Sequence, residues 1–112
     1  MQTPNENGAY RAEHREEVAR MGHAHATLHF CHCEDGLHRF AVSMEWSTGG
    51  KGEPISAEDE GFATLAEARD AGLRRLLARW PAVWPSEPQS VRDELQAMKA
   101  QVQARFAQPS LF

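Results

Sequence analysis

Histidine and cysteine side chains are the most conspicuous groups in this sequence that could do chemistry, with six His and two Cys in 112 residues. Three of them, His29, Cys31 and Cys33, alternate along a predicted strand and therefore share one face. Same-face residues on a strand lie ~6.6 Å apart, so His29 and Cys33 would be separated by ~13 Å. A single Zn²⁺ with ligand bonds of ~2 Å cannot take all three, although two could bind with help from elsewhere. His32 would lie opposite His38 on the other face. We therefore predict an outward face rich in His and Cys, and no metal or other cofactor.

A Cys–His nucleophile would need a lowered thiol pKa, a base within hydrogen-bond reach and an oxyanion site. Neither Cys31 nor Cys33 adjoins a Gly-rich turn or a helix N-terminus in the sequence. Paired carboxylates, a phosphate-binding loop and a G-x-S-x-G motif are also missing from the sequence. A structural disulfide between the two Cys residues is not expected, and reduced thiols fit the cytosol. The sequence predicts a protein that is not an enzyme.

The net charge and the lengths of the apolar runs indicate which kinds of partner to expect. The formal net charge is −4, which argues against strong direct binding to nucleic acid. The longest apolar runs fall far short of the ~18 residues of a membrane span, and no signal peptide is visible. We expect a cytoplasmic protein that does not contact a membrane.

The sharpest binding signal is the last stretch of the sequence, Gln108-Pro109-Ser110-Leu111-Phe112. Leu111 and Phe112 are large apolar side chains that we expect at an exposed end, where they would suit a hydrophobic cleft. Gln108 can both donate and accept hydrogen bonds at the rim of such a cleft. Pro109 stiffens the peptide and lowers the entropy lost on docking. The alternative is that Leu111 and Phe112 fold back over the core of their own domain.

This pentapeptide resembles the short peptide by which bacterial proteins dock onto the β sliding clamp of the replicative polymerase. The family pattern is Gln, any residue, a small polar residue, Leu and Phe. Gln108, Ser110, Leu111 and Phe112 match it, while Pro109 stands where Leu is usual. The resemblance covers five residues and implies a clamp-binding protein of DNA replication or repair, or a mobile-element factor that recruits or inhibits the clamp.

Two alternating stretches, 24–33 and 37–47, predict the strands of a hairpin. A two-residue turn would place their apolar rows on opposite faces, whereas a three-residue loop over 34–36 buries both rows together. That loop puts Gly36 in the left-handed position that three-residue hairpins use. The predicted register has three pairs: Phe30 with Phe40, Leu28 with Val42, and Ala26 with Met44.

The segments flanking the hairpin are less regular. Residues 1–22 are predicted to be a polar segment with a helix over 9–21. Residues 48–59 are predicted to be a loop rich in Gly and charge, with a short third strand around Ile55 or around 60–63.

A helix is predicted to start at Thr64, where Thr64 and Glu67 form a capping box. Arg69 falls within its apolar stripe. Its stem could pack while its head snorkels or pairs with a carboxylate such as Glu45, or it could be a cation positioned in a partner site. The apolar stripe contains these residues: Leu65, Ala66, Leu73, Leu76, Leu77 and Trp80.

The last helix is predicted over residues 86–107, after a break at Trp80 to Pro85 in which Trp80 and Trp84 would close one end of the core. Its apolar stripe is narrow, as in a coiled-coil seam. The helix therefore either packs along its own domain or pairs with a second copy to form a homodimer. The stripe contains these residues: Val91, Leu95, Met98, Val102 and Phe106.

Together these elements predict an α+β protein, with an antiparallel β-hairpin or three-stranded sheet covered by one helix and followed by a long C-terminal amphipathic helix. The divisions are a polar segment over 1–22, a β-β-(β)-α domain over 23–85, the helix over 86–107 and the tail over 108–112. This layout resembles HicB-type antitoxin partner domains and double-stranded-RNA-binding-like folds. That resemblance implies a second function, an antitoxin-like or regulatory oligomer with a dimerising last helix.

Overall fold

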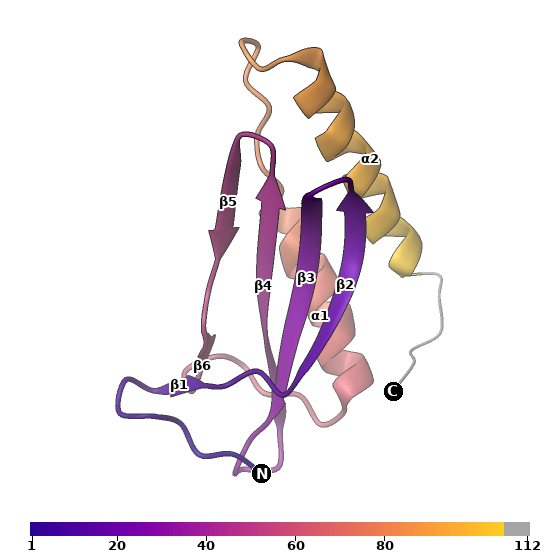
Figure 1. The fold of residues 1–112 in the computed structure, drawn as a ribbon. Helices are drawn as coiled ribbons and strands as arrows, with labels where there is room; N and C mark the ends of the chain where they lie inside the picture. The colour runs from indigo at the N-terminus through magenta and orange to yellow at the C-terminus, as the bar shows by residue number, and fades with distance from the viewer. Residues whose placement is uncertain (107–112) are drawn as a thin grey trace.

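The computed structural model describes residues 1–106, and its centre is a four-stranded antiparallel sheet. Two helices cover one face of this sheet, and a two-stranded ribbon lies against part of the other face (Figure 1). The α+β class is as predicted. The sheet, in the order β2-β3-β4-β5, contains His14–Met21, Ala24–His32, His38–Trp46 and Gly49–Gly52. The ribbon pairs β1 (Ala9–Tyr10) with β6 (Ile55–Ser56), and the helices are α1 (Leu65–Ala78) and α2 (Gln89–Arg105).

The hairpin of β3 and β4 has the predicted register, with all three predicted pairs in place. Its loop is closed by a hydrogen bond of 2.9 Å from the Cys33 N–H to the Leu37 carbonyl. Gly36 has a φ of +85°, the left-handed conformation that the three-residue loop requires. The apolar rows of the two strands alone therefore selected the correct pairing.

The predicted helix over 9–21 is wrong. Residues 14–21 form strand β2, which pairs with β3 through a register shift between Glu17 and Ala19. Gly22, at a φ of +61°, makes the tight turn between the two strands. Pairing along β3 satisfies the backbone of β2 and buries Val18 and Ala19, which outweighs the weak local preference for helix.

The glycine-rich loop after β4 contains more structure than predicted. Gly49–Gly52 forms strand β5 at the edge of the sheet, within the stretch that was predicted to be a loop. The short strand predicted around Ile55 exists as β6, but it pairs with β1 and is not a member of the main sheet.

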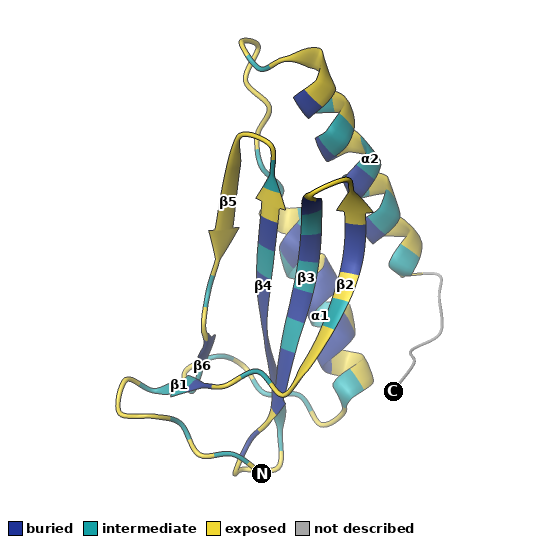
Figure 2. Ribbon diagram, viewed as in Figure 1, coloured by how far each residue is buried: buried dark blue, intermediate teal, exposed yellow. Residues whose placement is uncertain are grey.

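Helix α1 begins as predicted. Thr64 is its N-cap, and its hydroxyl accepts a hydrogen bond of 3.1 Å from the Glu67 N–H. The buried face of α1 is shifted slightly from the predicted stripe, because Ala66 is exposed whereas Ala68, Arg69 and Gly72 are buried. This face packs against β4 and β3 and closes one side of the main core (Figure 2).

Helix α2 packs along its own domain, mainly against β2. The connection between the helices contains Trp80, which packs partly against the core, and Trp84, which is 67% exposed. The prediction that both tryptophans close the core is therefore wrong for Trp84. Within residues 1–106, neither helix is long and apolar enough to cross a membrane.

Candidate functional site

The predicted clamp-binding residues Gln108, Pro109, Ser110, Leu111 and Phe112 lie outside the described part of the chain. The nearest described structure is the end of α2, where Arg105 and Phe106 precede the tail. This end of the helix is the described structure that precedes the candidate binding residues in the sequence.

The apolar stripe of α2 does not form a free seam. Four of its members are buried in the core of their own domain, so the dimer-seam interpretation is wrong for these side chains. Their burial means that a second copy could reach them only if the domain opened. Phe106 is 40% exposed, and the Arg74 guanidinium lies 5.7 Å from the centre of its ring. The four buried residues are Val91, Leu95, Met98 and Val102.

Arg69 is not a cation presented to a partner. Its Nε lies 2.7 Å from Glu16 Oε1 and its Nη2 lies 3.0 Å from Glu16 Oε2, a bidentate pair. Both side chains are nearly buried, with exposures of 8% for Arg69 and 11% for Glu16. The proposed pairing with Glu45 is wrong, since Glu45 lies 3.6 Å from His25 on the other face of the sheet. Glu16 was not recognised as the partner because residues 9–21 were predicted to form a helix, whereas Glu16 lies in strand β2.

The same ion pair fixes the end of α2. Arg69 Nη1 lies 3.5 Å from the carbonyl oxygen of Arg105, and Arg105 Nη1 lies 3.7 Å from Glu16 Oε2. A cation is favourable beside the last carbonyls of a helix because of the helix dipole. Strand β2, helix α1 and the C-terminal end of α2 are thus joined at one point, immediately before the tail.

Cys31 and Cys33 lie on the face opposite the helices. They were predicted to be exposed there, but they are buried. Their exposures are 2% and 0%, because the ribbon of β1 and β6 covers this end of the sheet. Both are free cysteines, and their Sγ atoms lie 3.1 Å apart. Tyr10 and Ile55, one from each ribbon strand, complete this second small core. The sequence did not predict that the ribbon covers the cysteines, because the residues of β1 fell within the predicted helix over 9–21.

His29 does not join the two cysteines. Its Nε2 lies 2.7 Å from the Ser43 hydroxyl on the neighbouring strand β4. Burial, followed by the nearby charge of Arg15, lowers the pKa of His29. Among the described residues, no three His, Cys, Asp or Glu side chains are placed to hold one metal ion.

Arg39 provides the main positive charge beside the cysteines. It donates from Nη2 to Asp35 Oδ2 at 2.8 Å and from Nε to the Asp59 carbonyl at 2.9 Å. Its hydrogen bonds with Asp35, followed by its interaction with Cys33, raise the pKa of Arg39. Burial, followed by the proximity of Cys33, raises the pKa of the Tyr10 hydroxyl. Arg39 and Tyr10 therefore both adjoin the Cys33 thiol.

The surroundings of Cys31 raise the pKa of its thiol, whereas the surroundings of a nucleophilic cysteine lower it. Burial, followed by the hydrogen bond to Cys33, raises the pKa of its thiol strongly. A reactive catalytic cysteine requires a lowered thiol pKa. Burial therefore favours the protonated, less reactive form of the Cys31 thiol.

The predicted opposition of His32 and His38 is confirmed. Their rings stack with centroids 4.4 Å apart and planes 5° apart. Burial, followed by the charge of His32, lowers the pKa of His38. This pair lies near the loop of the β3–β4 hairpin and contacts neither sulfur atom in any described hydrogen bond.

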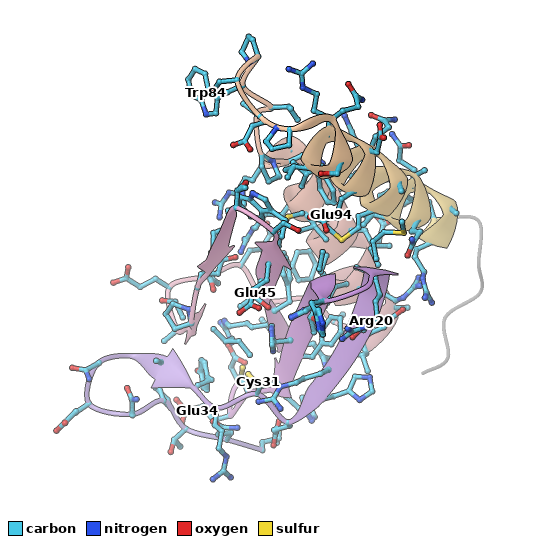
Figure 3. The ribbon with its side chains drawn as sticks, turned by 45° about the horizontal axis from the view of Figure 1, so that its top comes forward. Arg20, Cys31, Glu34, Glu45, Trp84 and Glu94 are labelled. Carbon is cyan, nitrogen blue, oxygen red and sulfur yellow. The ribbon has the colours of Figure 1, made fainter. Side chains whose placement is uncertain are left out.

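The loop between the helices contains Trp84, which was predicted to close one end of the core but is 67% exposed. Trp84 projects at the end of the molecule away from Cys31 (Figure 3). Val83 beside it is 40% exposed. Two prolines flank this pair in the sequence and restrict its backbone.

Comparison with known proteins assigns no family to this chain. No protein-family model matches it, and neither does any curated protein or solved structure.

Proposed function

We propose that this protein is a small, non-enzymatic binding protein that docks on the bacterial β sliding clamp through Gln108-Pro109-Ser110-Leu111-Phe112. The observation that carries the proposal is the match of Gln108, Ser110, Leu111 and Phe112 to the clamp-binding pattern. Leu111 and Phe112 supply the apolar anchors that a hydrophobic cleft binds. Docking would recruit the protein to replication or repair, or let a mobile-element protein occupy the clamp.

The arrangement of α2 supports this proposal. The apolar stripe of this helix is used inside its own domain, and its end is tied to Arg69 and Glu16. The tail therefore follows a fixed point of the folded domain. A short peptide attached to a fixed point loses less freedom on docking than one attached to a frayed helix.

Direct binding to purified bacterial β clamp tests the proposal. Calorimetry with the full chain should give a micromolar dissociation constant, which corresponds to roughly −8 kcal/mol. The double variant Leu111→Ala/Phe112→Ala should abolish binding because both anchors are removed. A synthetic peptide of residues 104–112 should compete with the full chain for the same site.

Two further variants make the test specific. Trp84→Ala removes a large apolar side chain that is 67% exposed and lies outside the proposed motif, and it should leave clamp affinity unchanged. Pro109→Leu restores the residue that the clamp-binding pattern usually has, and it should bind at least as tightly as the wild type. Absence of binding by the wild-type chain would refute the proposal, as would loss of binding in Trp84→Ala but not in Leu111→Ala/Phe112→Ala.

A further inference from the structure

The two cysteine sulfur atoms form a pair that the proposed function does not use. Both thiols are free and buried on one face of β3 and its continuation, with their Sγ atoms 3.1 Å apart. Cys33 continues the strand ladder beyond His32, because its N–H bonds the Leu37 carbonyl. The two residues therefore keep the spacing of alternate positions on an extended strand.

This spacing opposes a disulfide. Same-face Cβ atoms on a strand lie ~6.6 Å apart, whereas a disulfide needs Cβ atoms ~3.8 Å apart. Both side chains already point toward each other across the distance between their Cβ atoms. The Sγ–Sγ distance of 3.1 Å is therefore near the shortest that this backbone allows. A covalent S–S bond would require the backbone of β3 to fold inward, which its ladders to β2 and β4 resist.

The same spacing suits a metal ion held between the two sulfur atoms. At metal–sulfur bonds of ~2.3 Å, two sulfur ligands lie between ~3.8 and ~4.6 Å apart, according to the angle at the metal. Reaching that separation requires the Cys31 and Cys33 side chains to rotate slightly apart, which relaxes their present contact. Opening the pair is therefore easier than closing it.

We propose that Cys31 and Cys33 form a two-coordinate site for a soft monovalent metal ion of the Cu(I) class. Thiolate sulfur is the ligand that selects Cu(I), and two ligands are enough for that ion. Binding converts two thiols and one cation into a bis-thiolate complex of net charge −1, and two protons leave. A buried zinc site is not supported, because a structural zinc ion takes four ligands and the described residues supply no group of three.

The positive charge of Arg39 favours a complex with one negative charge, whereas burial opposes it, as the raised pKa of the Cys31 thiol shows. Tyr10 packs in the same buried cluster as the two cysteines, and the Arg39 guanidinium lies 5.8 Å from the centre of the Tyr10 ring. A cation this near can stabilise an anionic sulfur by charge. Glu13 and Glu34 oppose this effect, and Asp35 pairs with Arg39 at 2.8 Å. Arg39 is nevertheless more deeply buried than all three carboxylates. The ribbon of β1 and β6 excludes water from the sulfur atoms, which strengthens the interaction with Arg39.

Competition with a coloured chelator tests this site. The reduced full-length chain is titrated without oxygen into the Cu(I) complex of bathocuproine disulfonate, whose absorbance reports the Cu(I) that the protein removes. One equivalent of Cu(I) per chain should transfer. Cys31→Ala and Cys33→Ala should each bind at least 100-fold more weakly, because one sulfur alone cannot hold the ion. X-ray absorption of the wild-type complex should show two sulfur ligands, and this measurement needs no variant.

His29→Ala is the matched control, since His29 shares the face and strand of Cys31 but bonds Ser43. Its Cu(I) affinity should equal that of the wild type, and loss equal to that of the cysteine variants would overturn the two-sulfur site. The proposal also fails if the wild-type chain removes no Cu(I) from the chelator. It fails equally if the two thiols disappear as a disulfide when the denatured protein is titrated with Ellman's reagent.

Discussion

The two faces of the sheet are built from the same strands but are covered in different ways. On one face, helices α1 and α2 bury large side chains such as Leu28 and Phe30. On the other face, two strands of two residues each cover a small cluster around Cys31 and Cys33. The rest of that second face presents polar residues, among them His25 and Ser43.

The two faces should therefore contribute differently to the stability of the protein. The hydrophobic effect scales with buried apolar area, so the helix-covered face should supply most of the stability. The ribbon-covered face buries little apolar area, and it carries both thiols and Arg39. A thin cover can open locally without unfolding the domain. The following substitutions test whether the two faces differ in this way.

Leu28→Ala should have the largest effect. Leu28 is fully buried beneath α1 on the helix-covered face. Removing it should lower the free energy of unfolding by about 3–4 kcal/mol, since both the transfer energy and a cavity are lost. Chemical denaturation followed by circular dichroism measures this change. A loss below about 1 kcal/mol would contradict the dominance of this face.

Glu16→Gln should have the next largest effect. It leaves the Arg69 guanidinium nearly buried without a charged partner, which should cost about 2–3 kcal/mol of stability. The double variant Glu16→Leu/Arg69→Met removes both charges and should recover most of that loss. A double-mutant cycle by denaturation measures the coupling, and additive losses would show that the pair is not coupled.

Ile55→Ala tests the ribbon-covered face. Ile55 is buried in the small core beside the cysteines, so the unfolding free energy should fall by about 2 kcal/mol, near the low end for such a change. The reactivity of the native thiols toward Ellman's reagent should rise much more than in Leu28→Ala, because the cover opens locally. Equal thiol exposure in the two variants would show that the two faces open together.

The smallest effect should be that of pH on the His32–His38 stack. Burial lowers the pKa of His38 in the folded state, so the folded chain binds fewer protons than the unfolded chain near that pKa. Stability should therefore be full above about pH 6.5 and should fall as the pH drops below that value. Melting temperatures between pH 7.5 and 5 should decline less in His38→Phe, which keeps a stacked ring. An identical decline in this variant would exclude His38 as a cause.

The correct predictions concern neighbouring residues in the sequence. The hairpin register follows from two apolar rows separated by a short loop, and the cap at Thr64 follows from two residues one turn apart. The errors concern distant partners. Strand β2 and the cover over Cys31 depend on pairing between segments whose own patterns favour helix or loop.

Arg69 shows most directly what cannot be predicted from the sequence alone, namely which distant residue is its partner. Its place in an apolar stripe signalled that it must be neutralised or presented to a partner, and the sequence left both outcomes open. Only the position of β2 against α1 and α2 identifies Glu16 as the counterion. Candidate carboxylates are numerous in a chain with 16 Asp and Glu residues, so distance in three dimensions was the deciding information.

The sequence by itself determined the α+β class, the hairpin, the start of α1 and the presence of an amphipathic last helix. It also contains the five residues that resemble the clamp-binding pattern, because a short linear motif can be compared from residue identities alone. The tertiary structure decided that α2 covers its own sheet, that Arg69 pairs with Glu16 and that the two cysteines are buried side by side. The physical reason is that local patterns fix which face of an element is apolar, whereas burial of that face depends on long-range packing.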